Sequence, residues 1–380
     1  MKNTKILVGF ILLNALNSYA TTSSSITKNY LTTNNFPTTI NLCQTKSDFI
    51  EKASVINNHG IVSGSIHSIN QNGICNEHAF LWENASKLIE VIPFVKIPDK
   101  IVHATTISSI STDNQTVGIN FVADNFSEYR MGAYNAIMNP SSALLSENYP
   151  QQISESGKFV AGFNFGGQVF IYDTESKHLM LDFKLKNNPL INIQNATLAA
   201  VDNKGTAVGT INLSETEVYP LICEYHNQSC EYIKADTKYG ACFLSTISTD
   251  GREILGHCNS HGHTELVKFD QTSHKIMPIP QTIDLHSPHS ITDDKIAIIS
   301  DLSKHSYLYD AKNGKVYSTL DFAAKLDLPT NIDANKIALS PDGHNVLFDS
   351  RDFSTANYAV KIYLTMGVAE FMHKNLTPLN

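Results

Sequence analysis

The sequence contains little arginine, little tryptophan and no cluster of positive charge. Three arginines and a single tryptophan, Trp82, occur among 380 residues, and the formal net charge is −8. Because nucleic-acid binding depends on clustered Lys and Arg that neutralise phosphates, this composition argues against a nucleic-acid partner. After the first twenty residues, no apolar run is long enough to cross a membrane as a helix. We therefore expect no nucleic-acid partner and no membrane span.

The common sequence signatures of catalysis are also missing. There is no Gly-x-Ser-x-Gly elbow, no His-Glu-x-x-His pair and no Gly-Lys-Ser/Thr phosphate loop. We name no catalytic residue and expect the chain not to be an enzyme, although this question stays open from the sequence.

The N-terminus has the pattern of a secretory signal peptide. A short basic segment at residues 2–5 precedes an apolar stretch, Ile6–Leu13, and Ser18 and Ala20 supply small residues at the positions that a signal peptidase reads. We predict that residues 1–20 are a signal peptide, so that the protein is secreted or periplasmic. The Ser/Thr/Asn-rich residues 21–36 are predicted to be a flexible lead-in.

Six cysteines are then expected in an oxidising compartment, where they form disulfides. Two predicted hairpins place cysteines directly opposite each other, if residues 249–251 make a three-residue loop and residues 226–227 make a two-residue loop. Opposed residues of antiparallel strands bring their Cβ atoms close enough to bridge. Free buried thiols are the alternative. The two opposed pairs are Cys242 with Cys258 and Cys223 with Cys230. The pair that remains is Cys43 with Cys75.

A unit of about 47 residues recurs along the chain. Its clearest copy, Leu244–Cys258, predicts two strands joined by a tight turn at Asp250-Gly251. Asp113-Asn114 and Asp293-Asp294 stand where two further turns are due, and both residue types favour turns. The turn glycines, separated by one or two periods, are Gly60, Gly157, Gly205, Gly251 and Gly343. A second glycine follows most turns after four or five residues, at Gly64, Gly118, Gly162, Gly209 and Gly256.

Each copy continues with an aromatic-rich strand such as His305–Asp310, a polar turn and, except in the last copy, a fourth strand. Repeated sets of four short strands are typical of a β-propeller. We predict an all-β, seven-bladed propeller over residues 37–366, with six or eight blades as alternatives, and a mildly helical tail at residues 367–380. We expect Thr38–Cys43 to pair with Tyr358–Tyr363 and close the ring, because this pairing removes an open sheet edge.

Two stretches resemble known repeats. Gly60-Ile-Val-Ser-Gly64 with His78-Ala-Phe-Leu-Trp82 resembles the HAF-type repeat of bacterial extracellular proteins. Leu339-Ser-Pro-Asp-Gly343 followed by Val346-Leu-Phe348 is similar to the Ser-Pro-Asp-Gly repeat of periplasmic Tol-type propellers. Each match covers one copy well and the others loosely. The resemblance implies the fold and export, and it implies no reaction.

Candidate binding residues gather in the longer predicted loops. In a propeller, the loops between second and third strands share a face with the links between blades, and long loops on a rigid scaffold commonly carry binding residues. Arginine beside an aromatic residue is typical of binding hot spots, and imidazoles are common metal ligands. The alternatives are surface ion pairs and a solvated polar loop. The candidates are Tyr129, Arg130, His257, His261, His263, Arg351 and Asp352, of which the three histidines are also the metal candidates.

The sequence thus favours a secreted, non-enzymatic propeller that binds a protein or glycan partner through its long-loop face, as a monomer and without a cofactor. One alternative is an exported propeller enzyme, a lyase or hydrolase with a His-lined and metal-dependent site. Another is a periplasmic envelope scaffold.

Overall fold

The computed structural model describes most of the chain from residue 148 onward and shorter stretches before it. The signal-peptide prediction for residues 1–20 and the strand predicted at Thr38–Cys43 lie outside the described residues. The described residues are 25–32, 50–69, 75–84, 87–90, 102–112, 117–123, 129–134, 148–164, 166–187, 193, 195–214, 217–236, 238–260, 263–280, 283, 285–350 and 357–379.

The described chain is mostly β and forms antiparallel meanders, which we number I to VII. Meanders IV and V are joined into one nine-stranded sheet by a parallel bridge between Val218 and Ala241. Meanders I to III consist of β2 (Ile50–Ile56), β3 (Val62–Ile69), β4 (Cys75–Asn84) and β5 (Lys87–Glu90); β6 (Val102–Ile110), β7 (Val117–Ala123) and β8 (Tyr129–Tyr134); and β9 (Asn148–Ile153), β10 (Phe159–Asn164), β11 (Val169–Asp173) and β12 (His178–Met180).

Meanders IV to VII continue the pattern. They consist of β14 (Ala196–Val201), β15 (Thr206–Asn212), β16 (Val218–Glu224) and β17 (Ser229–Tyr232); β18 (Ala241–Ile247), β19 (Ile254–Ser260), β20 (His263–Asp270) and β21 (Lys275–Pro278); β22 (Leu285–Ile291), β23 (Ile296–Asp301), β24 (Ser306–Asp310) and β25 (Lys315–Ser318); and β26 (Ile332–Leu339), β27 (Asn345–Ser350) and β28 (Asn357–Leu364) with β1 (Ile26–Thr32). A short strand, β13 (Lys184–Leu185), pairs in parallel with β17 on the outer side of meander IV.

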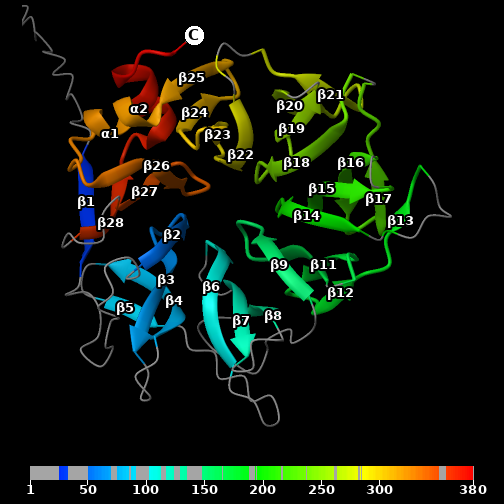
Figure 1. Ribbon diagram of the computed structural model, residues 1–380, viewed down its shortest axis with the longest axis horizontal. Coiled ribbons are helices and arrows are strands. Elements are labelled where there is room, and N and C mark those ends of the chain that lie inside the picture. Colours follow the sequence, from blue (N-terminus) through cyan, green and yellow to red (C-terminus); the bar gives the residue numbers. More distant parts are fainter. Residues whose placement is uncertain are drawn as a thin grey trace, which may run out of the picture.

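The meanders lie side by side around a common centre, with their first strands nearest to it (Figure 1). Neighbouring first strands contact one another in a complete cycle, in the order β2, β6, β9, β14, β18, β22, β26 and back to β2. Because the last of these contacts joins opposite ends of the chain, the described meanders form a ring.

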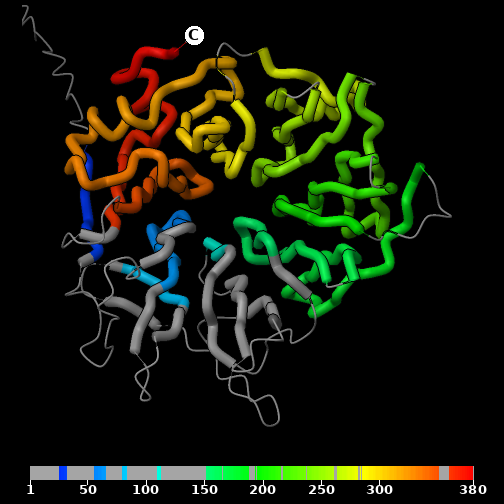
Figure 2. The backbone as a smooth tube through the Cα atoms, in the orientation of Figure 1, coloured from blue at the N-terminus to red at the C-terminus, as the bar shows by residue number. Residues whose placement is uncertain are grey.

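The outer strand of meander VII comes from the N-terminal part of the chain. In β1, Tyr30 pairs with Val360 and Leu31 with Ala359 of β28, whose other neighbour is β27, so that β1 takes the place predicted for Thr38–Cys43 beside Tyr358–Tyr363 and that predicted pairing is wrong. Leu31 is fully buried. Residues 26–32 were predicted to belong to a flexible lead-in, and this prediction is wrong for them. Their Ser/Thr/Asn-rich composition concealed the strand, because an edge strand is held by backbone hydrogen bonds and needs few apolar side chains. Figure 2 shows this segment, in blue, beside the C-terminal segments in red and orange.

The predicted turn glycines are confirmed. Gly60, Gly157, Gly205, Gly251 and Gly343 have φ between 70° and 80°, and in meander VI the corresponding residue is Lys295 with φ 67°. A polar side chain at the first position of the turn accepts a backbone N–H from beyond the turn, as Ser248 Oγ does from Glu253 at 3.0 Å. The same type of bond is made by the side chains of Asn57, Ser154, Asp202, Thr292 and Ser340.

Where a unit has a second glycine, this residue lies opposite a β-bulge in the first strand. The register between β14 and β15 shifts between Leu198 and Ala200, opposite Gly209. A Cβ on Gly209 would lie 1.9 Å from the carbonyl oxygen of Thr197. Glycine is therefore required at position 209, where the two backbones approach each other. Meander VI has a bulge at His289 opposite Ile298 and Ile299, so a bulge in the first strand does not in itself require a glycine.

Two helices pack beside meander VII, where the two ends of the chain meet. α1 (Thr319–Lys325) links meanders VI and VII, and α2 (Gly367–Asn375) forms the predicted C-terminal tail. Phe322 of α1 and Phe371 of α2 make a T-shaped contact with ring centroids 5.4 Å apart. Both rings are buried in a cluster shared with β24, β27 and β28, so that α2 covers the junction of the last two meanders.

Candidate functional site

The tight turns between first and second strands form a hydrogen-bonded belt at one end of the ring, which we call the turn end. The second residue of each turn does most of the bonding. Asn203 Nδ2 donates to Glu155 Oε2 at 3.1 Å, Asn58 Nδ2 donates to Glu155 Oε1 at 2.7 Å, and the backbone N–H of Asp342 donates to Asn58 Oδ1 at 2.8 Å. Thr249 Oγ1 also donates to Asp293 Oδ1. The belt holds neighbouring turns together and occupies their polar groups.

A cavity of about 300 Å³ lies between the first strands, around the centre of the ring. Its polar wall comes from bulged residues such as Gln151, Ser245 and His289. The residues that precede the turns also line it and are all buried aliphatics: Ile56, Ile110, Ile153, Val201, Ile247, Ile291 and Leu339. These aliphatic side chains lie beside the belt, whose Glu155 and Thr249 also line the cavity.

The opposite end of the ring carries the longer connections, and we call it the loop face. Between meanders III and IV it holds a hollow of about 900 Å³. Three connections surround this hollow: the one between β10 and β11, the one before β14, and the one between β15 and β16. The lining residues that the structure describes carry no charged side chain: Phe163, Asn164, Gly166, Gly167, Asn195, Ala196, Thr197, Asn212, Leu213, Ser214 and Val218.

Backbone contacts fix the shape of this hollow. Gly167 has φ 71°, and a Cβ there would lie 2.8 Å from the backbone nitrogen of Asn195. Ala196 donates its N–H to the Gly167 carbonyl at 2.9 Å, and Asn212 donates its N–H to the Asn195 carbonyl at 3.0 Å. The Asn164 side chain accepts the N–H groups of Gly166 and Gln168. The two loops and the link are thus held to one another without the side chains of Asn195 and Asn212, which are exposed.

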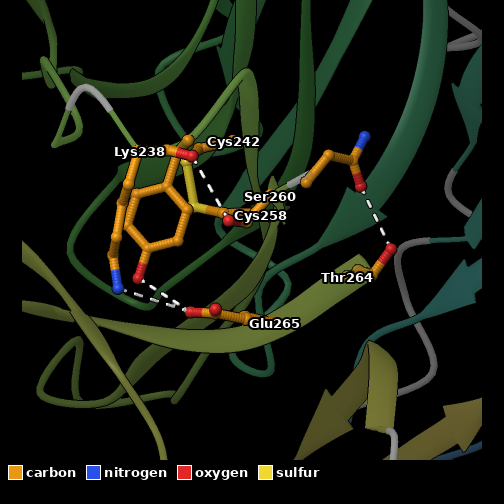
Figure 3. The surroundings of a disulfide bond; sticks show 8 residues. Lys238, Cys242, Cys258, Ser260, Thr264 and Glu265 are labelled. Carbon is orange, nitrogen blue, oxygen red and sulfur yellow. Dashed lines mark hydrogen bonds and ion pairs between the residues drawn. A yellow bond between two sulfur atoms is a disulfide. The ribbon is translucent and has the colours of Figure 1, made fainter. Parts of the chain in front are cut away.

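A disulfide stabilises the neighbouring part of the loop face, in meander V (Figure 3). Cys242 and Cys258 are directly opposed on β18 and β19 and are bonded. Tyr239 packs in the same buried cluster as this disulfide, and its hydroxyl donates to Glu265 Oε2 at 3.0 Å. Lys238 Nζ lies 4.5 Å from the centre of the Tyr239 ring. The disulfide therefore supports a rigid edge of the loop face that carries the Lys238 ammonium and the Glu265 carboxylate.

The second predicted disulfide, between Cys223 and Cys230, is also present, in the predicted hairpin register. For Cys242 and Cys258 the pair is right but the predicted loop is wrong. Ser248 bonds Glu253 across the turn instead of facing Arg252, and a bulge at Ser245 restores the cysteine register. The remaining pair is not described, because Cys43 lies outside the described residues.

The structure does not bring the candidate histidines together. His257 lies within β19 opposite Phe243, whose ring stacks on its imidazole at 4.8 Å, whereas His263 is exposed at the start of β20. The strands run on to Ser260 and His263, which pair, so His257 and His263 point to opposite sides of the sheet. Burial, followed by the charge of nearby His286, lowers the pKa of His257. The predicted loop 257–263 shrinks to residues 261–262, and His261 lies outside the described residues.

The other candidates are only partly placed. Tyr129 and Arg130 begin β8, paired with Val122 and Phe121, and thus do not lie in a loop as predicted. Strand β7 continues to Ala123, farther than the sequence suggested. Arg351 and Asp352 lie outside the described residues. Among the residues that the structure does describe, no three His, Cys, Asp or Glu side chains are grouped so as to hold a metal ion.

Sequence reasoning missed a lysine at the seam between meanders VII and I. Lys361 of β28 is 8% exposed, and its Nζ donates to the Gly60 carbonyl at 2.8 Å and to the Glu83 carbonyl. The same Nζ lies 4.8 Å from the Trp82 ring. Burial lowers the pKa of Lys361 to about 8. No sequence signal marks it, because its partners are more than 270 residues away.

The chain matches no family model and no curated protein. Among solved structures it is similar to the β-propeller domain of the Trilobed protease from Pyrococcus furiosus, with 11% identity over 84% of this chain and 94% of that one and a TM-score of 0.52. It also aligns with the extracellular domain of a putative hybrid two-component system from B. thetaiotaomicron, with 12% identity over 85% of this chain and 39% of that one and a TM-score of 0.47. The first likeness shows a β-propeller fold, and at this identity it shows the fold alone.

None of the helices in the described part of the chain has the length and apolar character that a membrane crossing requires.

Proposed function

We propose that this chain is an exported, non-enzymatic β-propeller that binds a protein or glycan partner through its loop face. We further infer seven blades, corresponding to meanders I to VII, with β1 closing the last blade. The cyclic contacts of the first strands and the pairing of β1 with β28 support this count.

Export is supported by the disulfides and by the motif resemblances. Two disulfides join strands within single meanders, and such bonds persist mainly in oxidising compartments. The likeness to HAF-type and Tol-type repeats agrees with a protein outside the cytoplasm. A secreted protein and a periplasmic one share these features, and fractionation of the producing cells separates the two.

The hollow of about 900 Å³ on the loop face is the observation that carries the binding proposal. At the turn end, the polar groups bond to one another: Lys186 pairs with Glu224 at 2.7 Å, and Lys295 with Asp250 at 2.9 Å. On the loop face, the polar side chains of Thr197, Asn195 and Asn212 are exposed around a concave surface. Polar groups in a concave, rigidly supported place are suited to recognition.

The experiment is capture of a partner by the purified protein, followed by amide hydrogen exchange of the complex. Envelope fractions, surface fractions of candidate host cells and an oligosaccharide panel are the sources. We expect slower exchange in the loop-face segments 164–168, 212–217 and 238–240. Protection confined to the turns at 57–60, 202–205 and 248–251, or no partner from any source, would reject the proposal.

A further inference from the structure

We propose that the hollow between meanders III and IV is a binding site for a neutral, short oligosaccharide. This inference rests on the proposed function and specifies the ligand class for one part of the loop face. The site is formed by the described lining residues of the three connections that surround the hollow, and its direct contacts are assigned to Asn195, Thr197, Asn212 and Phe163.

The first argument is the charge of the wall. Among the lining residues that the structure describes, none is charged, and the Glu217 carboxylate beside them accepts the hydroxyl groups of Ser214 and Tyr219. A phosphorylated, sulfated or carboxylated ligand would find no basic partner among these residues and would lie near this carboxylate. Burial of an unpaired charge is unfavourable. A neutral ligand with many polar groups meets no such cost.

The second argument is the chemistry of the polar groups. Amide side chains offer a donor and an acceptor side by side, and hydroxyl side chains can do either. Each sugar hydroxyl also donates and accepts, so Asn195 and Asn212 match a pair of neighbouring hydroxyls. Both side chains are exposed, as is Thr197, and the shape of the hollow does not depend on them.

The third argument is the apolar part of the wall. Phe163 is half-buried at the end of β10, and Leu213 and Val218 line the opposite loop. Sugar rings have an apolar face of C–H groups that packs on such surfaces, while their hydroxyls point to the amides. The volume of about 900 Å³ lies within the range of roughly 300–1,000 Å³ that is typical of small-molecule sites. It therefore accommodates a short oligosaccharide.

The test measures the affinity of the purified full chain for a panel of neutral oligosaccharides by titration calorimetry. The panel holds glucans, mannans, galactans and chitin oligomers, with uronic-acid oligomers as the anionic comparison. Asn212→Ala removes one amide and is expected to weaken binding about tenfold. Thr197→Trp fills the hollow and is expected to abolish binding. Circular dichroism and intact disulfides verify the fold of each variant.

Asn259→Ala is the matched control. Asn259 is an exposed asparagine at the loop-face end of β19, in meander V and outside the hollow. Its replacement is expected to leave the affinity unchanged. Asn212→Asp adds a charge to the hollow and is expected to weaken binding of a neutral sugar at least as much as Asn212→Ala does.

Oligosaccharide binding that Asn212→Ala and Thr197→Trp leave unchanged would overturn the site and keep the proposed function, because the glycan would then bind elsewhere on the chain. Binding of uronic-acid oligomers or of a protein alone, protected at the loop face, would overturn the neutral ligand and keep the proposed function. Absence of any glycan or protein partner would overturn both.

Discussion

The turn end and the loop face of the ring are built from the same meanders and differ in what their polar groups do. At the turn end, short turns of one type repeat around the axis, and Asn58, Glu155 and Asn203 bond to one another across meander boundaries. On the loop face, the connections differ in length and sequence, and exposed amides such as Asn212 surround a hollow. The comparison indicates that the repeated end maintains the ring, and that the divergent end is available for recognition.

The largest expected effect is a difference in the free energy of unfolding between two glycine replacements in meander V, one opposite a bulge and one on the loop face. A Cβ on Gly256 would lie 1.9 Å from the Phe243 carbonyl oxygen, whereas the nearest atom to a Cβ on Gly240 is 3.8 Å away. We expect Gly256→Ala to lower the free energy of unfolding by about 3 kcal/mol or more, and Gly240→Ala to change it by less than about 1 kcal/mol. Urea unfolding under oxidising conditions measures both. Equal effects would show that the bulge does not constrain the backbone.

A second prediction concerns Lys361, at the seam between meanders VII and I, and the effect of pH on the free energy of unfolding. The pKa of Lys361 is about 8 in the folded chain, below the ordinary lysine value of 10.5. Between these values the unfolded chain binds the additional proton, so stability rises with pH. Relative to Lys361→Met, the wild type should gain up to roughly 3 kcal/mol between pH 8 and pH 10.5.

Urea unfolding of both proteins at pH 7.5, 9 and 10.5 measures this difference, and other titrations cancel in the comparison. A difference that does not change with pH, or that moves in the opposite direction, contradicts a buried ammonium at the seam.

The smallest expected effect is the difference in stability between two serine replacements, one at the turn end and one on the loop face. Ser248 is fully buried, and its Oγ accepts the Glu253 N–H at 3.0 Å, whereas Ser214 is exposed on the loop face. Ser248→Ala should cost about 1–3 kcal/mol, because a buried N–H loses its partner. Ser214→Ala should stay within about 0.5 kcal/mol. Thermal unfolding of the two variants checks this, and a larger loss for Ser214→Ala would reverse the assignment of the two ends.

Much of the scaffold could be read from the sequence because its signals are local. A glycine with positive φ at the fourth residue of the turn, as at Gly205 or Gly343, marks the first hairpin in five of the meanders. The pairing of Cys223 with Cys230 follows from the same local register. The Cys242–Cys258 prediction succeeded although its loop was wrong, because a bulge at Ser245 offset the longer turn.

The site was much less predictable. Arg130 and His257 were expected in loops, yet both lie in strands that run farther than their polar composition suggested. The hollow was missed because its wall combines three connections, and Asn195 and Asn212 resemble any other polar loop residue in an Asn-rich chain. No local pattern records which loops of neighbouring meanders face one another.

The sequence by itself determined the repeat, which is visible when its copies are compared. It also determined the turns and two cysteine pairs, since each of these depends on residues less than twenty positions apart. Only the tertiary structure decided which N-terminal segment pairs with β28, that Lys361 reaches the carbonyls of Gly60 and Glu83, and that a hollow opens between meanders III and IV. The physical reason is that these contacts depend on ring geometry, which brings together residues that the sequence holds far apart.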